Sequence, residues 1–337
     1  MHSPHDMGMI RKDGNHMDHS LLEQIRSSCK AVAERAVYVR INHDNIPLYA
    51  SSLPLDVSAP PSPDPSCHYL GHGDDTVAFF LTLNAINFGS GYFPYLRKRN
   101  TLSGYFTIAS ALNDHFNEHG PFSARQLREI NAQDCARLFH QDAACRPAFE
   151  LMGLFARALN DLGGYLLDSF SGSFVKLVES AHFSADRLVK LLVRLPFYDD
   201  VASYRGMNVK FFKRAQITAA DLFLAFEGSG PGRFDDIDRL TIFADNLVPH
   251  VLRLDGVLGY DAELLSRIER EVEIAADSQE EIEIRACAVH ACELLVGELR
   301  RLGRNVNSMK LDQFLWNRGQ LPEFKRHPRH RTRTVFY

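Results

Sequence analysis

The sequence predicts an all-α protein, a mainly helical globule with at most a few short strands. From Asp74 onward, nearly every apolar stretch repeats with the period of an α-helix. Glycine and proline fall between these stretches rather than inside them, and the alternation typical of strands is sparse. With 337 residues, of which 45% are hydrophobic, the chain can bury a sizeable core. We therefore expect helices that pack face to face.

The apolar period places the individual elements. Alternation at residues 37–41 predicts a short strand, and Ser123 has the position of a helix N-cap. Pro249 cannot continue a helix interior cleanly, so a kink or a fresh helix start is expected beside Asp245. The predicted helices cover residues 21–36, 76–88, 150–170, 184–195, 209–226, 237–254, 262–274 and 279–302.

Composition also suggests the boundaries of the folded part. We expect residues 1–18 to form a disordered tail and residues 19–66 to form an N-terminal segment that ends in a proline-rich loop. Residues 67–324 are predicted to form one helical domain. Residues 325–337 are strongly basic. They form either a solvated tail or a cap over an anionic ligand.

Charge and missing motifs exclude several classes of protein. The formal net charge of −4 gives no bulk attraction to nucleic acid. No apolar run is long enough to span a bilayer, and the six scattered cysteines are typical of reduced thiols in the cytoplasm. Dinucleotide, Walker, zinc-protease and serine-hydrolase motifs are all missing. We therefore expect a cytoplasmic protein without metal or cofactor, whose oligomeric state the sequence leaves open.

Two features that lie some thirty residues apart form the main candidate site. Lys213 and Arg214 open an apolar helix, where a lysine lies beside free backbone N–H groups and suits a phosphate. Asp245 ends an apolar strip, and a carboxylate buried there costs several kcal/mol unless it is paired or functional. The alternatives are a packing network of Arg214 with Asp221 beside a solvated Lys213, and Asp245 as a helix cap.

The turn that follows the helix at 76–88 is a candidate binding surface for a flat ring. Phe88 and Tyr92 flank small, flexible residues, and the side chain of Asn87 could hydrogen-bond the edge of a heterocycle. The same pattern is also typical of a helix C-cap in which Gly89 takes a left-handed conformation. The two interpretations are compatible.

Acidic residues near the only tryptophan form a further candidate site. Glu283 lies early in a long predicted helix, and Asp312 precedes Trp316 near the end of the chain. Carboxylates beside an aromatic ring could accept N–H donors from a guanine-like edge. The alternative is an ordinary ion pair with Arg285 and a tryptophan in the core.

Several of these motifs, in this order, resemble the queuosine salvage family, whose members are queuosine 5′-phosphate N-glycosylases/hydrolases. They read FKRAQI at 212–217, ADL at 220–222, LTIFAD at 240–245, VP at 248–249, EIEIRA at 281–286 and DQFLW at 312–316. The resemblance runs from about residue 74 to 320. It implies an all-helical fold similar to helix-hairpin-helix DNA glycosylases. By position, Asp245 matches the family's catalytic aspartate and Lys213 its active-site lysine, whereas His250 stands where the family has glutamine.

The resemblance implies that the protein hydrolyses queuosine 5′-phosphate and releases queuine for tRNA modification. An aspartate can stabilise the oxocarbenium-like transition state and position the attacking water, and Lys213 would bind the phosphate or the sugar hydroxyls. We expect the remaining contacts to the substrate to come from Asn87, Phe88, Tyr92, Arg214, Asp221, His250, Glu283, Asp312 and Trp316. The alternatives are a non-catalytic nucleotide-binding or base-binding protein of the same fold and a DNA-repair-type glycosylase, against which the acidic net charge argues.

Overall fold

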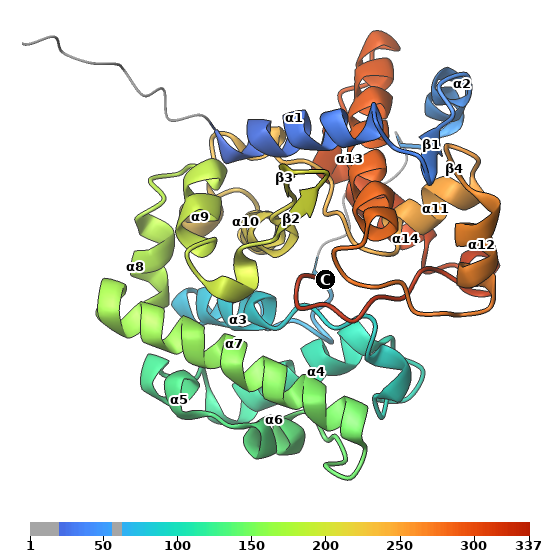
Figure 1. Ribbon diagram of the computed structural model, residues 1–337. Helices are drawn as coiled ribbons and strands as arrows, with labels where there is room; N and C mark the ends of the chain where they lie inside the picture. Colours follow the sequence, from blue (N-terminus) through green and yellow to red (C-terminus); the bar gives the residue numbers. More distant parts are fainter. Residues whose placement is uncertain (1–19, 56–62) are drawn as a thin grey trace, which may run out of the picture.

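The computed structural model describes residues 20–55 and 63–337. The expected N-terminal tail and part of the proline-rich loop lie outside these residues. In the described part, helices form most of the structure, and four short strands pair into two small antiparallel sheets (Figure 1). The all-α prediction is thus confirmed. No helix in this part of the chain is both long enough and apolar enough to cross a membrane.

The elements follow one another along the chain in the order below. The α-helices are α1 (Leu21–Ala33), α2 (Asn45–Ser52), α3 (Asp74–Ala85), α4 (Gly104–His119), α5 (Ala124–Glu129), α6 (Ala132–Leu138), α7 (Arg146–Phe170), α8 (Phe174–Glu179), α9 (Ala185–Leu192), α10 (Lys213–Ala225), α11 (Val248–Leu254), α12 (Ala262–Glu269), α13 (Gln279–Arg301), α14 (Ser308–Arg318) and α15 (Pro322–Lys325). The 3₁₀ turns are η1 (Phe93–Tyr95), η2 (Pro196–Tyr198), η3 (Gly230–Gly232) and η4 (Ile237–Arg239). Strand β1 (Val39–Ile41) pairs with β4 (Leu258–Tyr260), and β2 (Val201–Tyr204) pairs with β3 (Met207–Lys210).

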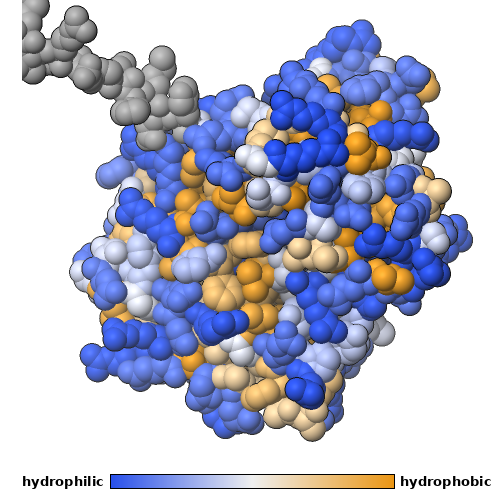
Figure 2. All heavy atoms as spheres, in the orientation of Figure 1, coloured by the Kyte–Doolittle hydropathy of each residue, from blue (hydrophilic) through white to orange (hydrophobic). Residues whose placement is uncertain are grey.

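Two helices, α3 and α13, organise the core, since most of their residues are buried. Helix α13 packs against α1, α2, α11 and α14, while α3 packs against α4, α7, α8 and α10 (Figure 1). The apolar stripe that predicts α1 is fully buried, and it consists of Leu22, Ile25, Cys29 and Val32. The segment before residue 67 therefore shares the core of the helical body. Hydrophilic residues cover most of the face in Figure 2, with hydrophobic residues reaching the surface mainly near its middle.

Local signals place several helix ends correctly. The hydroxyl of Ser123 accepts a hydrogen bond from the backbone N–H of Gln126, and the Gln126 side chain binds back to Ser123, which forms a capping box. The predicted starts or ends of α1, α7 and α13 agree with the structure within a few residues. All six cysteines are free, and all except Cys145 are buried.

The predicted helix at 237–254 is wrong as a continuous element. Residues 240–247 belong to no helix or strand, and α11 starts afresh at Val248 with Pro249 in its first turn. Side chains take the hydrogen bonds that a helix would need, since the N–H of Thr241 donates to Gln216 and the N–H of Phe243 donates to Asp312. We call residues 240–247 the extended strip. The expected fresh start beside Asp245 is confirmed.

The start of α10 is held in an unusual backbone conformation. Residues 209 and 210, predicted as the start of a helix, belong to strand β3, and the helix begins only at Lys213. The residue before it, Phe212, has a φ of 47°, a left-handed value that is costly for a bulky side chain. Asp200 stabilises this turn, because its backbone oxygen accepts from Phe211 and its Oδ2 accepts from the N–H of Lys213 at 3.3 Å.

Residues 326–337, here called the C-terminal segment, fold back across the body of the protein. The segment does not form a solvated tail, since His330, Thr332 and Tyr337 are buried. Its last carbonyl oxygen accepts a hydrogen bond from Gly89 at 2.9 Å. A Cβ atom on Gly91 would lie 2.2 Å from the carbonyl oxygen of Thr332, so only glycine allows this approach. The segment ends near the centre of the molecule in Figure 1.

Candidate active site

One cavity of about 980 Å³ lies between the helical body and the C-terminal segment. Its walls come from segments far apart in the sequence: α3 and the turn that follows it, the start of α4, one face of α10, the extended strip, α14 and the C-terminal segment. Most of the residues singled out from the sequence border it, namely Asn87, Phe88, Lys213, Asp221, Asp245, His250, Asp312 and Trp316. Lys213 and Asp245, which the sequence singled out together, thus border the same cavity.

Lys213 is a buried ammonium without a direct partner. It is the first residue of α10, and only 6% of its surface is exposed. Within the described residues, its Nζ forms neither a hydrogen bond nor an ion pair. Burial lowers the pKa of Lys213, while the nearby carboxylates of Asp245 and Asp312 raise it, and burial dominates. A solvated Lys213 is thus excluded, and its charge faces the cavity.

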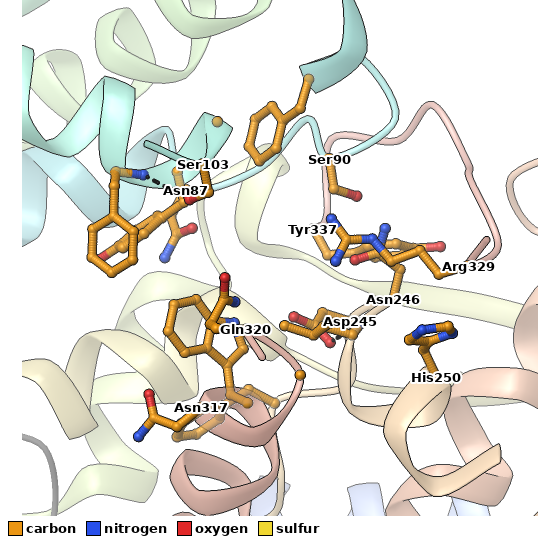
Figure 3. Close-up of a pocket in the computed structure, with 18 of the residues that line it drawn as sticks. Asn87, Ser90, Ser103, Asp245, Asn246, His250, Asn317, Gln320, Arg329 and Tyr337 are labelled. Atoms are coloured by element: carbon orange, nitrogen blue, oxygen red, sulfur yellow. Dashed lines mark hydrogen bonds between the residues drawn. The ribbon is translucent and has the colours of Figure 1, made fainter. Parts of the chain in front are cut away.

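Asp245 serves as a helix cap and also borders the cavity. Its Oδ1 accepts hydrogen bonds from the N–H groups of Leu247 at 2.7 Å and Val248 at 3.1 Å, which fixes the carboxylate at the start of α11. No hydrogen bond within residues 20–55 and 63–337 uses Oδ2. Figure 3 shows Asp245 in the middle of the cavity wall. The cap and a functional role therefore use different oxygens of the same carboxylate.

Asp312 is a second carboxyl group at the cavity. It comes from α14, is 4% exposed, and accepts the N–H of Phe243 at 2.8 Å through Oδ1. Burial and then the charge of Asp245 raise its pKa well above the usual range, against the lowering effects of Phe243 and Lys213. Asp312 is thus suited to hold a proton beside Asp245, as one member of a pair of neighbouring carboxyl groups does.

At one end of the cavity, a row of hydrogen-bonded polar side chains lies near aromatic rings. The amide of Asn87 donates to Asn84 at 3.0 Å, and the amide of Asn84 donates to Asp221 at 2.8 Å. Burial raises the pKa of Asp221 to about 6. The ring of Trp316 lies edge-on to Tyr105, with centroids 6.2 Å apart. A flat heterocycle has both ring faces and hydrogen-bonding partners here.

Two residues predicted to contact the substrate lie away from the cavity. The carboxylate of Glu283 accepts three backbone N–H groups at residues 37–39 and the hydroxyl of Tyr204. It therefore anchors the start of β1. The hydroxyl of Tyr92 donates to Glu150 at 2.8 Å, and its ring lies under the guanidinium of Arg333. Neither prediction holds, because both polar groups are already used within the protein.

Arg214 and Phe88 pack against each other in the core. The guanidinium of Arg214 lies 4.7 Å from the ring centroids of both Phe88 and Tyr198 and donates to the carbonyl of Ala85 at 2.6 Å. Arg214 therefore neither pairs with Asp221 nor reaches the cavity. Phe88 borders the cavity but is only 1% exposed, so its ring faces are covered by protein.

His250 lines the cavity as a neutral imidazole. Its Nε2 lies 3.0 Å from the carbonyl oxygen of Phe324, and the residue is 3% exposed. Burial is the main cause that lowers the pKa of His250 to about 4. The ring therefore joins α11 to α15 and carries no charge near neutral pH.

A buried ion cluster lies directly behind the cavity wall. Arg285 donates to both carboxylate oxygens of Asp200, at 2.6 and 3.0 Å, and lies 3.5 Å from Glu281. Its Nε donates to the carbonyl of Ala244, next to Asp245, and its guanidinium faces the ring of Tyr337 at 4.7 Å. We call Arg285, Asp200, Glu281 and Tyr337 the Arg285 cluster. It ties together the start of α10, the extended strip and the C-terminal segment.

The sequence did not single out several polar residues of the cavity. Ser90, Asn246, Arg329 and Tyr337 all border it (Figure 3). Two signals pointed to this region: the basic composition of residues 325–333, and the small residues around Ser90. Only the folding of the C-terminal segment against the turn at 89–91 brings these signals together.

Fold and site together define a mainly helical protein that encloses a small polar ligand among carboxyl groups, an ammonium and aromatic rings. Residues 67–337 match the family model described as queuosine salvage protein, so the chain belongs to the queuosine salvage family. The resemblance noted from the sequence motifs is confirmed.

Curated relatives carry a more specific name. A protein of Sphaerobacter thermophilus called queuosine 5′-phosphate N-glycosylase/hydrolase is 35% identical over 318 residues, covering 93% of this chain and 97% of its own length. A mouse protein of the same name is 31% identical over 340 residues, covering 93% and 98%. One from Dictyostelium discoideum is 39% identical over 217 residues, covering 64% and 66%.

Proposed function

We propose that this protein hydrolyses the N-glycosidic bond of queuosine 5′-phosphate to give queuine and ribose 5-phosphate. The names of its relatives give the substrate and the reaction. The observation that carries the proposal is the meeting of Lys213, Asp245 and Asp312 at one cavity, with aromatic rings at one end. Such a cavity offers separate places for a sugar and for a flat base.

Asp245 acts at the sugar in this proposal. As the bond between C1′ and the base nitrogen breaks, its electron pair stays on the base and the ribose gains positive charge. The Oδ2 of Asp245, which has no described hydrogen-bond partner, faces that charge and stabilises it. Water then adds to C1′, and its proton passes to Asp245. The cap through Oδ1 keeps the carboxylate fixed throughout.

Asp312 and Lys213 support the two sides of the reaction. Queuine is a 7-deazaguanine, so its five-membered ring lacks the nitrogen that commonly accepts a proton in purines. The departing base therefore takes its proton elsewhere, and Asp312, whose pKa burial raises, can donate one to the edge of the ring. The ammonium of Lys213, influenced by both carboxyl groups, stabilises the carboxylate of Asp312 after its proton has left and donates to sugar hydroxyls.

Turnover of the purified protein tests this proposal. Incubation with queuosine 5′-phosphate, followed by chromatography, is expected to show queuine and ribose 5-phosphate in equal amounts. Tight binding of the nucleotide without release of queuine would instead identify a non-catalytic binding protein. Tight binding of duplex DNA in a gel shift at physiological salt would favour a DNA-repair-type glycosylase.

A further inference from the structure

The side chain of Gln216 holds the start of α10 against the extended strip. Gln216 is the fourth residue of α10 and is fully buried. Its Nε2 donates to the carbonyl oxygen of Phe211 at 3.0 Å and to the hydroxyl of Thr241 at 2.9 Å. Its Oε1 accepts the backbone N–H of Thr241 at 2.9 Å. One amide group therefore binds both the turn before Lys213 and the strip that contains Asp245.

A second connection between the same two segments runs through Asp200 and Arg285. The Oδ2 of Asp200 accepts the backbone N–H of Lys213 at 3.3 Å. Arg285 donates to both carboxylate oxygens of Asp200 and, through Nε, to the carbonyl oxygen of Ala244 at 3.1 Å. The backbone that carries Lys213 is thereby joined to the backbone next to Asp245 at a second, separate point.

The turn between these connections has a backbone conformation that other contacts must maintain. Phe212, directly before Lys213, has a φ of 47°, and such a left-handed residue costs about 1–3 kcal/mol. It persists only where surrounding bonds hold it. No hydrogen bond or ion pair within residues 20–55 and 63–337 restrains the Nζ of Lys213. The ammonium is therefore placed through the backbone of this turn rather than through polar contacts of its own.

We propose that Gln216 and Asp200 are positioning residues, which fix the ammonium of Lys213 in relation to the carboxylate of Asp245. Neither Gln216 nor Asp200 borders the cavity, so neither touches the substrate. The inference rests on the proposed function, in which Lys213 and Asp245 act on the same ribose. Placement matters there, because a shift of about 1 Å in a reacting group can lower the rate about 100-fold.

A double-mutant cycle with Lys213 tests the positioning role of Gln216. Gln216→Met removes the hydrogen bonds of the amide from a side chain of similar length, and we expect kcat/KM per folded molecule to fall about tenfold. In Lys213→Met, the same substitution is expected to change kcat/KM by less than about twofold, because no ammonium remains to be positioned. Asp200→Asn is expected to behave in the same way. Gln133→Met, at an exposed glutamine on α6, is the matched control.

A conservative pair of substitutions at Thr241 tests the other end of the same contact. Thr241→Val keeps the shape of the side chain but removes the hydroxyl that Gln216 binds, so kcat/KM is expected to fall about threefold. Thr241→Ser keeps the hydroxyl and is expected to restore the rate. Should Gln216→Met not fold, as judged from its melting temperature, this pair decides the question, and equal rates of the two variants would overturn the proposal.

The ionisation of Lys213 reports its position without any turnover. Burial lowers the pKa of Lys213 in the parent protein. If Gln216→Met releases the turn, water reaches the ammonium, and the pKa is expected to rise toward its ordinary value. An NMR titration of protein with isotope-labelled lysine measures this, with the signal of Lys213 assigned by its loss in Lys213→Met.

The outcomes separate failure of the positioning role from failure of the proposed function. Equal relative effects of Gln216→Met in the parent and in Lys213→Met would show a structural role only and overturn the proposal. An unchanged pKa of Lys213 in Gln216→Met would overturn it as well. If the parent protein releases no queuine, the proposed function fails, and the lysine titration alone decides whether Gln216 positions the ammonium.

Discussion

Two buried cations, Arg285 and Lys213, lie near the extended strip, and their surroundings differ. Arg285 donates to both oxygens of Asp200, and the charges of Asp200 and Glu281 raise the pKa of Arg285 despite its burial. Lys213 is buried to a similar degree, has no direct partner in the described residues, and its pKa is lowered. The first charge is compensated within the protein, whereas the second is not.

The difference indicates which charges maintain the structure and which are available to a ligand. A guanidinium with its planar donors suits a permanent bidentate pair, while an ammonium is a point charge that can change partners. Burying an uncompensated charge is costly, so its presence requires an explanation from function. By this criterion the charge of Lys213 is available to a ligand, whereas the charge of Arg285 supports the fold.

The largest expected effect is on turnover, at Asp245. Asp245→Asn keeps an oxygen that can accept the N–H groups of Leu247 and Val248 but removes the negative charge. We expect kcat to fall at least about 100–1,000-fold, the usual cost of losing an electrostatic contact to the transition state, with a melting temperature close to that of the parent. Queuine release from queuosine 5′-phosphate measures this. Asp235→Asn, at an exposed aspartate, is the matched control, and a parental rate in Asp245→Asn would refute the assignment.

Removal of the paired cation Arg285 is expected to lower the free energy of unfolding. Arg285→Met leaves the carboxylates of Asp200 and Glu281 buried without their cation. Removal of one partner from a buried pair typically costs about 3–5 kcal/mol in the free energy of unfolding. Denaturant titration measures the loss, with the exposed Arg301→Met as control. A change below about 1 kcal/mol would show that the cluster does not stabilise the fold.

Replacement of Lys213 by methionine is not expected to lower the free energy of unfolding, in contrast to the same replacement of Arg285. Lys213→Met removes a buried charge that has no direct partner, so the free energy of unfolding is expected to stay equal or to rise. Activity is expected to fall about 10–100-fold, because the contact to the ribose is lost. Parallel denaturant titrations and kcat/KM values test this split. Destabilisation as large as that of Arg285→Met would remove the distinction between the two cations.

The smallest expected effect is a change in the dependence of stability on pH. The pKa of Asp221 is about 6 in the folded protein, above its ordinary value, so the folded state holds a proton that the unfolded state releases. This stabilisation is complete below about pH 4 and is lost as the pH rises through 6. Asp221→Asn removes the titration, and its melting temperature is expected to exceed that of the parent at pH 7 but not at pH 4. Parallel pH profiles for the two proteins would contradict the raised pKa.

Helical periodicity and the residues at helix ends predicted much of the fold. The apolar stripes and terminal residues of α1, α7 and α13 lie within those helices themselves, so a local pattern is enough to find them. They did not predict the extended strip, whose backbone is bound by the distant side chains of Gln216 and Asp312. The site shows the same division. Lys213 and Asp245 stood out as charges among apolar neighbours, and both reach the cavity.

The remaining site residues depend on tertiary contacts that leave little trace in sequence. Helical spacing shows which residues share a face but not which face borders a cavity, and Glu283 was therefore assigned to the ligand although it binds the start of β1. Arg329 was overlooked for the opposite reason. It lies in a segment without any period, and the close approach of Gly91 to Thr332 fixes the position of that segment.

The C-terminal segment also determines when the cavity can be completed during synthesis. Residues 326–337 leave the ribosome after all the other walls, so a nascent chain can build its helical body before the cavity is closed. A protease that trimmed these residues would remove one wall and leave most of the core intact. Tyr337 is only 2% exposed, so a substitution at this position would disturb the packing of the segment.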